Sequence, residues 1–459
     1  MKRLLPNIEM KRIIVTILAL LMMAGGAYAQ YEYSGGSGSE EKPYIIKTAD
    51  DLVALSNYFL DSKVNKEYKH YKLVNDINMA GKTFVPIGGL SKSWGKYNPV
   101  MDNSFVGHFN GGGYVIKNLR VTVSFSSNDK CVGFFGIVGD DDGTTVIESL
   151  TVEYDGLGYG NSDNVGGLAG KVTGKVIVRN VNVKSEKNFE VRGSSGGLFG
   201  SVNAFSLKVE NCSVKVPMKL NGTNCGGLIG YVFYCEDFLL KSSFYNGVIE
   251  YTEQIVGGLV GELKVGSVEN CGFKGSIVQS AGGNSEIGSV GGCVGVMDKS
   301  ASLKNCLAVA DSIDCSSEVG GLVGSLAGSS SGNFSIYNCY SKGAIKTEGK
   351  GLNSNISVGV IKEGGYKIDN VYAQDDVLDD IDGNGYAAEK LFPQLYMQSG
   401  CLAKYMNDEV GETVWYEDVD GVNDGYPIPA GLKISANSGS GSAPSCHPIV
   451  RTDSVSGIG

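Results

Sequence analysis

Most of the chain consists of short runs of apolar residues that are separated by glycine-rich turns. Residues 175–179, Lys-Val-Ile-Val-Arg, are typical of these runs. Runs of this length, rich in β-branched residues and bounded by glycine, predict β-strands. The repeated part of the chain lacks the 3.6-residue period of a helix. The pattern therefore predicts an all-β fold made of many short strands.

The strand pattern recurs about every 31 residues, as the positions of two signatures show. One is Val-Gly-Gly-Leu-Val-Gly, whose second glycine in six copies is Gly167, Gly197, Gly227, Gly258, Gly292 and Gly321. The other is centred on an asparagine, at Asn118, Asn180, Asn211, Asn270, Asn305, Asn338 and Asn370. Ser149 and Ser242 fill the two gaps, so nine copies follow one another at spacings of 28 to 35 residues. Such regularity indicates a repeat architecture.

Each asparagine marks a break in the strand pattern. The residue two positions before it is always apolar, and the residue directly after it is apolar or small. Inward-facing positions in a strand alternate with period two, so this change of phase predicts a bulge or a corner. A corner in every coil would stack the asparagines in a ladder of hydrogen-bonded amides. The alternative is that asparagine is simply a common turn residue.

We therefore expect a right-handed parallel β-helix, a solenoid of about nine coils with small caps that contain short helices. Thr48 to Asp51 form a capping box before a helix, and a second helix is expected from Ala387 to Asn407, interrupted by Pro393 and Gly400. The expected segments are a signal peptide (1–29), an N-terminal cap with the first coils (30–115), the repeat β-helix (116–375), a C-terminal cap (376–432) and a flexible Ser/Gly-rich tail (433–459).

The first residues predict export. Lys11 and Arg12 precede the apolar run Ile13 to Met23, and the small-residue site Ala27-Tyr28-Ala29 follows, which is the order of a secretory signal peptide. The apolar run is shorter than the ~20 residues that span a bilayer. The formal charge is −10, and removing residues 1–29, which carry +3, leaves −13. This charge disfavours nucleic acid and anionic lipid as partners. We expect a secreted or cell-surface protein without membrane insertion of the mature chain.

The glycine-rich copies resemble the GLUG motif of bacterial surface and secreted proteins, and the flanking segments are similar to the caps of such proteins in Bacteroidetes. The flanks are Thr48 to Leu52, Leu73 to Met79 and Phe105 to Gly111 near the N-terminus, and Ser399 to Asn407 before Trp415 near the C-terminus. The resemblance covers nearly the whole mature chain. It implies a β-helix and a surface or secreted location, and it does not imply an activity.

GLUG motifs also accompany metallopeptidases that cleave immunoglobulin A. Such an enzyme needs His-Glu-x-x-His, so that two imidazoles one helical turn apart hold zinc. None of the three histidines, His70, His108 and His447, is followed by glutamate. The peptidase motif is therefore absent from this sequence.

The acidic clusters are candidates for catalytic or metal sites. Asp140 to Asp142 fall in a turn, Asp375 to Asp382 lie at a cap boundary, and no column of Asp, Arg, Lys or His recurs on adjacent coils. Asp418 to Asp424 resemble the front of a calcium loop but lack its distant glutamate, so an Asp-Gly turn is favoured. We expect no catalytic residue, metal or cofactor.

Eleven cysteines in an exported chain suggest disulfides. Cys212, Cys271, Cys306 and Cys339, however, share a repeat position that Leu or Val occupies in other copies, which predicts small core residues. A disulfide between Cys271 and Cys306 in successive coils stays open. The odd total leaves at least one thiol free or bonded to another chain.

Tyrosines offer the remaining functional hint. A face lined with tyrosine can stack on sugars or bind a protein, and the candidates among 24 tyrosines are Tyr231, Tyr234, Tyr245 and Tyr251. These rings could equally pack loops onto the β-helix. We expect a monomeric, non-catalytic scaffold for adhesion to an extracellular glycan or protein. The alternatives are a β-helix polysaccharide lyase or glycoside hydrolase, and a purely structural surface component.

Overall fold

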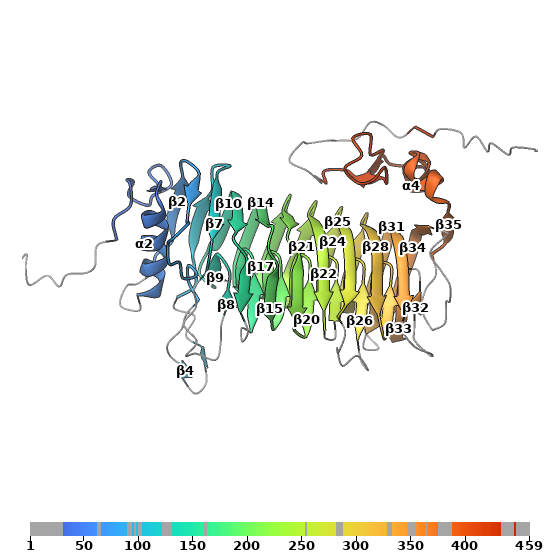
Figure 1. Cartoon of the computed structure of the whole chain (residues 1–459), viewed down its shortest axis with the longest axis horizontal. Coiled ribbons are helices and arrows are strands. Elements are labelled where there is room, and N and C mark those ends of the chain that lie inside the picture. Colours follow the sequence, from blue (N-terminus) through green and yellow to red (C-terminus); the bar gives the residue numbers. More distant parts are fainter. Residues whose placement is uncertain are drawn as a thin grey trace, which may run out of the picture.

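The computed structural model describes residues 31–61, 66–89, 94–95, 98–99, 103–121, 131–159, 163–252, 255–280, 288–327, 333–347, 354–355, 357–363, 365–374, 388–432 and 445–446. These residues form a long rod of stacked parallel strands (Figure 1). The expected signal peptide lies outside the described residues, as do Asp375 to Asp382.

Each coil places its strands beside the matching strands of the next coil, in parallel. A sheet of eight short strands contains β8 (Cys131–Val132), β12 (Asn164–Gly166), β16 (Ser194–Gly196), β20 (Asn224–Gly226), β23 (Ile255–Gly257), β26 (Ser289–Gly291), β29 (Glu318–Gly320) and β32 (Ser354–Asn355).

The other strands of the coils join in one continuous sheet of 25 strands: β1 (Tyr44–Ile46), β2 (Lys69–Leu73), β3 (Ile77–Asn78), β6 (Gly107–Asn110), β7 (Val115–Leu119), β9 (Phe135–Val138), β10 (Thr144–Tyr154), β11 (Leu157–Tyr159), β13 (Ala169–Val172), β14 (Lys175–Ser185), β15 (Phe189–Arg192), β17 (Phe199–Glu210), β18 (Ser213–Lys215), β19 (Met218–Asn221), β21 (Ile229–Lys241), β22 (Phe244–Tyr251), β24 (Val260–Glu269), β25 (Gly272–Gln279), β27 (Val294–Lys304), β28 (Leu307–Cys315), β30 (Val323–Ala327), β31 (Asn333–Thr347), β33 (Val358–Glu363), β34 (Gly365–Gln374) and β35 (Lys390–Phe392). The predicted all-β parallel solenoid of about nine coils is confirmed.

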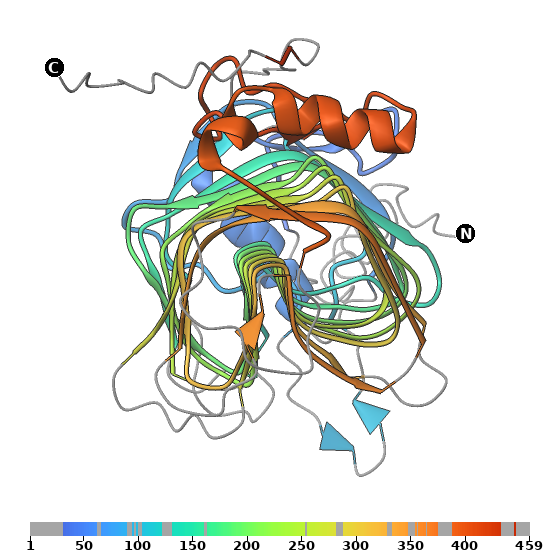
Figure 2. The same cartoon turned by 90° about the vertical axis from the view of Figure 1, so that its right-hand side faces the viewer.

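The Val-Gly-Gly-Leu-Val-Gly segments form a narrow inward fold in every coil, visible along the rod axis in Figure 2. Its two arms lie so close that a Cβ on Gly200, the last glycine of one copy, would be 2.5 Å from the backbone nitrogen of Val165. Its tip reaches the opposite wall, where a Cβ on Gly197 would be 2.4 Å from Cγ1 of Val214. The motif therefore needs glycine because backbone and side chains approach closely there.

The asparagine signature forms the predicted corner. Its residue has left-handed backbone, with φ between +49° and +55°, at Ser149, Asn180, Asn211, Ser242, Asn270, Asn305, Asn338 and Asn370. Asparagine tolerates this conformation better than most residues, which explains the choice of residue without any ladder. Asn118 is left-handed too, with φ +55°, and donates to Oδ1 of Asn78 at 2.9 Å, but it does not belong to this column. Its neighbour Leu119 pairs with Tyr154, five residues beyond Ser149, so Asn118 occupies a bulge in the following strand.

The ladder itself exists in part. Asn338 donates to Asn305 at 2.8 Å, and Asn305 donates to Asn270 at 2.9 Å. Asn180 and Asn211 are exposed, and no bond between their amides is seen. Both interpretations of the signature are therefore right, each for a different half of the rod.

The residue before each corner points outward and alternates in charge along the rod. In register, the column reads Glu148, Arg179, Glu210, Lys241, Glu269 and Lys304. Opposite charges side by side on neighbouring strands are stabilising, and like charges are destabilising. If each strand paired with the strand two coils away, like charges such as Glu148 and Glu210 would lie side by side. The column of alternating charges therefore favours the observed pairing.

The core fills the inside of the coils, and the predicted core cysteines lie in it. Cys212, Cys271, Cys306 and Cys339 are buried free thiols, so Cys271 and Cys306 do not form a disulfide. The one disulfide joins Cys401 to Cys446. It ties Cys446 to the folded protein, within a segment that sequence analysis assigned to a flexible tail.

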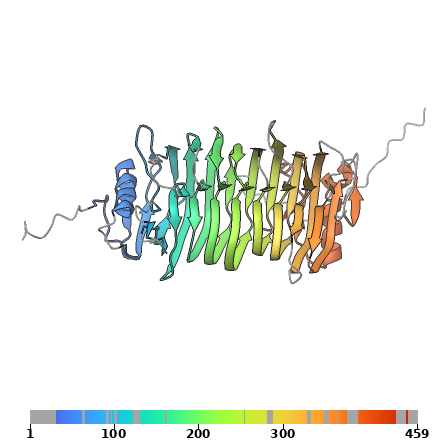
Figure 3. The same cartoon turned by 90° about the horizontal axis from the view of Figure 1, so that it is seen from below.

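The N-terminal end of the rod carries the helix α2 (Ala49–Leu60), as Figure 3 shows from below. The predicted capping box is confirmed, because Thr48 accepts from the backbone of Asp51 while the Asp51 carboxylate accepts from the backbone of Thr48. Leu52, Leu55 and Phe59 are buried against the first coils.

The C-terminal module, residues 388–432, lies along the side of the rod (Figures 1 and 2). The predicted helix is wrong in its first part, since Lys390 to Phe392 form β35. Two helices follow, α3 (Gln394–Gln398) and α4 (Cys401–Val410), and then a hairpin of β36 (Trp415–Tyr416) and β37 (Ile428–Pro429). The module shares a core with outward-facing residues of four coils, Phe244, Leu307, Tyr340 and Tyr372. It therefore covers a lateral face, and its strand β35 also pairs with β34 at the edge of the last coil, where a cap was expected.

Candidate functional site

Two of the four candidate tyrosines belong to the core. Tyr245 is fully buried, stacks on Phe273 with ring centroids 5.9 Å apart and donates to the carbonyl of Val216 at 2.9 Å. Tyr251 is buried as well and donates to the carbonyl of Asp314 at 2.8 Å. Their expected role in binding is therefore wrong, because both rings point into the coil from β22.

The other two tyrosines lie on the surface, next to two phenylalanines that sequence analysis missed. We call the set Phe205, Tyr231, Phe233 and Tyr234 the aromatic patch. Phe205 is 42%, Phe233 50% and Tyr234 45% exposed, while Tyr231 is half-buried. Tyr234 pairs with Asn203, two residues before Phe205, which brings β17 and β21 together at the patch. Phe205 could have been recognised from the strand alternation, because it faces outward between the buried Ala204 and the partly buried Ser206.

A partly buried ion pair supports the patch from the next coil, β24. The Lys264 ammonium lies 5.2 Å from the ring centroid of Tyr231 and 4.9 Å from that of Phe233. Glu262 lies 3.6 Å from Lys264 and accepts from the Asn224 side chain at 2.9 Å. A cation over two ring faces holds the rings in place, because the ring quadrupole attracts it.

Burial raises the pKa of Glu262, and the neighbouring Lys264 only partly offsets this effect. Burial would lower the pKa of Lys264, but its contacts with Tyr231 and Glu262 outweigh burial and raise it. Lys264 is therefore charged at neutral pH, and Glu262 is easier to protonate than an exposed glutamate.

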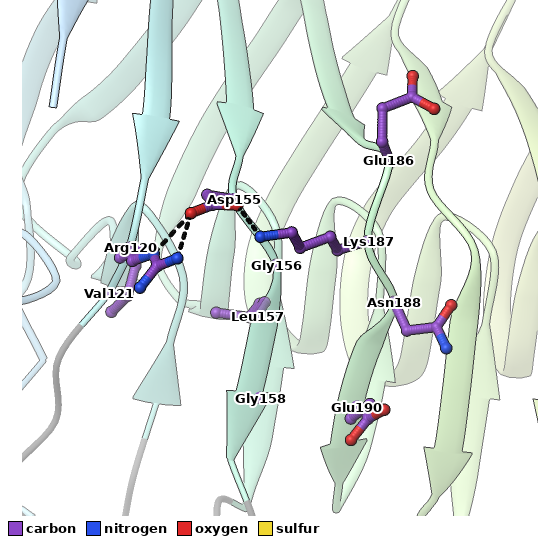
Figure 4. A pocket seen from close by; sticks show the side chains of 10 residues that line it. All are labelled: Arg120, Val121, Asp155, Gly156, Leu157, Gly158, Glu186, Lys187, Asn188 and Glu190. Carbon is purple, nitrogen blue, oxygen red and sulfur yellow. Dashed lines mark hydrogen bonds and ion pairs between the residues drawn. The ribbon is translucent and has the colours of Figure 1, made fainter. Parts of the chain in front are cut away.

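The expectation that no charged column recurs on adjacent coils is wrong for the column that runs from Glu148 to Lys304. The structure also brings three other charged residues of successive coils together. Asp155 accepts from Nε of Arg120 at 2.7 Å and also pairs with the ammonium of Lys187, as Figure 4 shows. Hydrogen bonds from Lys187 and Arg120 lower the pKa of Asp155. An ionised carboxylate held by two cations is a poor proton donor. The sequence did not reveal this cluster because its members lie at different numbers of residues after the corners of their coils.

The acidic turns have local structural roles. Asp140 accepts from the backbone N–H groups of Asp142 and Gly143. The Asp418 carboxylate accepts from the N–H groups of Val422, Asn423 and Gly425, so its oxygens face donors and not a cation. This is the Asp-Gly turn that the sequence favoured. Across the part of the chain that the structure describes, no group of three or more His, Cys, Asp or Glu residues could hold a metal ion.

The comparisons with known proteins agree with the repeat. Residues 316–346 match the GLUG motif family. A candidate Gly-rich membrane protein from Evansella cellulosilytica is 32% identical over 174 residues, which is 38% of this chain and 18% of that protein. Halomucin from Haloquadratum walsbyi is 29% identical over 215 residues, 44% of this chain and 2% of halomucin. The chain thus spans less than a fifth of either relative.

Among solved structures, the chain is similar to a candidate immunoglobulin A1 protease from Bacteroides ovatus, with 18% identity and a TM-score of 0.42. The match covers 87% of this chain and 96% of that one. Within the described residues, no helix has the length and apolarity needed to cross a membrane. The chain therefore carries a GLUG motif at residues 316–346 within a β-solenoid of repeated coils, and it is similar to proteins that contain this motif.

Proposed function

We propose that this protein is a non-catalytic scaffold outside the cell or on its surface, which binds a glycan or a protein through the aromatic patch. The observation that carries the proposal is the exposure of Phe233 and Tyr234 on β21, where Tyr234 pairs with Asn203 and Lys264 lies over the ring of Phe233. Exposed apolar rings are costly unless a partner covers them, and aromatic residues are enriched where proteins bind. The predicted signal peptide and the names of the two relatives support the location.

The geometry of the patch supports binding in a second way. Lys264 and Glu262 are only 18% and 14% exposed at their side chains, so they act beneath the rings and not as contacts at the surface. A ligand would therefore meet rings that are already fixed, and little side-chain entropy would be lost on binding.

A β-helix glycoside hydrolase or lyase is the second candidate. Glu262, with its raised pKa and with Asp298 of the next coil nearby, is the observation that favours it. Against it, the oxygens of Glu262 face Lys264 and Asn224, so the carboxyl group serves the patch. A purely structural surface component is the third candidate, and this function does not explain why the rings of the aromatic patch are exposed.

An array of glycans and matrix proteins tests the proposal. The Phe233→Ala/Tyr234→Ala double variant should bind its ligand at least about tenfold more weakly, equivalent to roughly 1.4 kcal/mol. Tyr366→Ala is the matched control, because Tyr366 is an equally exposed ring on β34, away from the patch. Equal binding by the double variant and the control would contradict the proposal. Product formation from a polysaccharide that Glu262→Gln abolishes would support the enzyme instead.

A further inference from the structure

A second candidate site lies on a different part of the rod from the aromatic patch. A shallow hollow of about 670 Å³ runs across three successive coils, and its lining includes Arg120, Asp155, Gly158, Lys187 and Glu190 (Figure 4). Neighbouring strands in such a rod are about 4.8 Å apart, comparable with the length of one pyranose unit. A chain-like ligand lying along the rod would thus meet one coil per unit.

The hollow presents hydrogen-bonding groups of both kinds. Arg120 and Lys187 hold Asp155 between them, and their side chains are still 68% and 62% exposed, so both keep N–H groups for a ligand. Glu186, Asn188 and Glu190 lie along the same side as Lys187, facing Arg120, and their exposed side chains make no hydrogen bond or ion pair with any residue that the structure describes. The hollow thus combines cationic donors with unpaired acceptors.

The floor of the hollow is flat. It consists of Gly156, Leu157 and Gly158, and the Leu157 side chain is buried inside the coil. A Cβ on Gly158 would meet only the carbonyl oxygen of Glu190, 3.9 Å away. The backbone of β11 is therefore open to a ligand that lies flat upon it.

These features select the class of ligand. Three carboxylates in the lining disfavour an anionic ligand, and the polar rim offers little to an apolar one. Adjacent hydroxyl groups, which donate and accept at once, match the mixed rim. We propose that the hollow binds a neutral polysaccharide along the rod axis. This extends the proposed binding function to a second site, which does not depend on the aromatic patch.

Calorimetry with the full chain and three probes, cellohexaose, mannohexaose and hexagalacturonate, tests the inference. At least one neutral probe should bind, and hexagalacturonate should not. Gly158→Trp should abolish binding by filling the floor, and Glu190→Gln should weaken it at least tenfold. Glu250→Gln is the matched control, because Glu250 stands at the same place in its coil, two coils beyond Glu190 and outside the hollow.

Several outcomes would overturn the inference. They are binding of neither neutral probe, preference for hexagalacturonate, displacement of the neutral probe by hexalysine at equal concentration, and unchanged binding by a folded Gly158→Trp variant. The Phe233→Ala/Tyr234→Ala variant should bind the hollow's ligand normally. A failure of the aromatic patch and a failure of the hollow are therefore distinguishable.

Discussion

Asn305 donates its side-chain amide to Oδ1 of Asn270 at 2.9 Å, although the two residues are 35 positions apart in the sequence. Asn338 donates to Asn305 in the same way, and the Asn270 amide donates to the carbonyl of Ala430 at 3.1 Å. A row of amides thus links three coils to the C-terminal module. Each middle member of the row uses both its donor and its acceptor.

The ladder predicts unequal effects of one substitution at two corners. Asn305→Asp should destabilise the protein by about 1–3 kcal/mol, because it removes a donor and places a carboxylate in a site that is only 6% exposed. Asn211→Asp should cost less than about 0.5 kcal/mol, because Asn211 is exposed. Urea denaturation of both variants measures the difference. Equal losses would remove the ladder as a source of stability.

The docking of the C-terminal module depends on an apolar strip. Leu307→Ser should loosen the module by about 2–4 kcal/mol, because it places a hydroxyl where a buried Leu side chain now packs beside Tyr340 and Trp415. Hydrogen exchange should then accelerate in α4 and remain slow in the central coils. Ser213→Ala, at the matching position of a coil outside the module's core, is the control. Equal acceleration in α4 and the central coils would mean that the strip serves the rod and not the docking.

The cysteines give a prediction of chemical reactivity. Burial raises the pKa of Cys212 to about 12, and burial raises that of Cys306 as well. These thiols, with Cys271 and Cys339, should react with a thiol reagent only after unfolding. Mass spectrometry without reductant should find nine labelled cysteines, and the intact Cys401–Cys446 pair. A native disulfide among the four would contradict the core assignment.

Glu148 predicts a loss of stability in acid. Burial alone would raise its pKa, but hydrogen bonds with Arg179 at 2.6 Å and His108 at 2.8 Å outweigh burial and lower the pKa below 4.5. The stability from these contacts is therefore fully present above pH 4.5, the ordinary value, and is lost as the pH falls through the lowered pKa.

Glu148→Gln should flatten this dependence. Between about pH 5 and pH 3 the variant should lose less stability than the unchanged protein, by less than about 1 kcal/mol, because the pair is partly exposed. Thermal melts across this range provide the measurement. Parallel curves for the two proteins would show that Glu148 does not contribute.

Much of the rod could be predicted from the sequence because each coil repeats the same local demands. The left-handed backbone that favours Asn305 is a local requirement, and the close approach of Val214 that requires Gly197 recurs in the same way from coil to coil. The core cysteines were predictable for the same reason, since their repeat phase equals that of buried Leu and Val.

The candidate binding surfaces were harder to predict because they depend on which way each residue faces. Tyr245 and Tyr234 look alike in the sequence, yet only Tyr234 points outward, and a bulge in β21 changes the phase near it. The docking strip left a signal that is clear in hindsight. Two residues after the corner, the earlier coils carry Thr151, Asn182 and Ser213, and the later coils carry Phe244, Leu307 and Tyr340.

The disulfide between Cys401 and Cys446 also sets the path of a pulling force through the chain. Tension applied beyond Cys446 passes directly to Cys401, since the covalent bond joins two residues whose sequence separation is 45. Trp415 and Ile428 lie in the loop that this bond bypasses, so the backbone on either side of them carries no tension. The pull arrives instead at α3, β35 and the last coil. Under reducing conditions the same force would run through the module and peel it from the side of the rod.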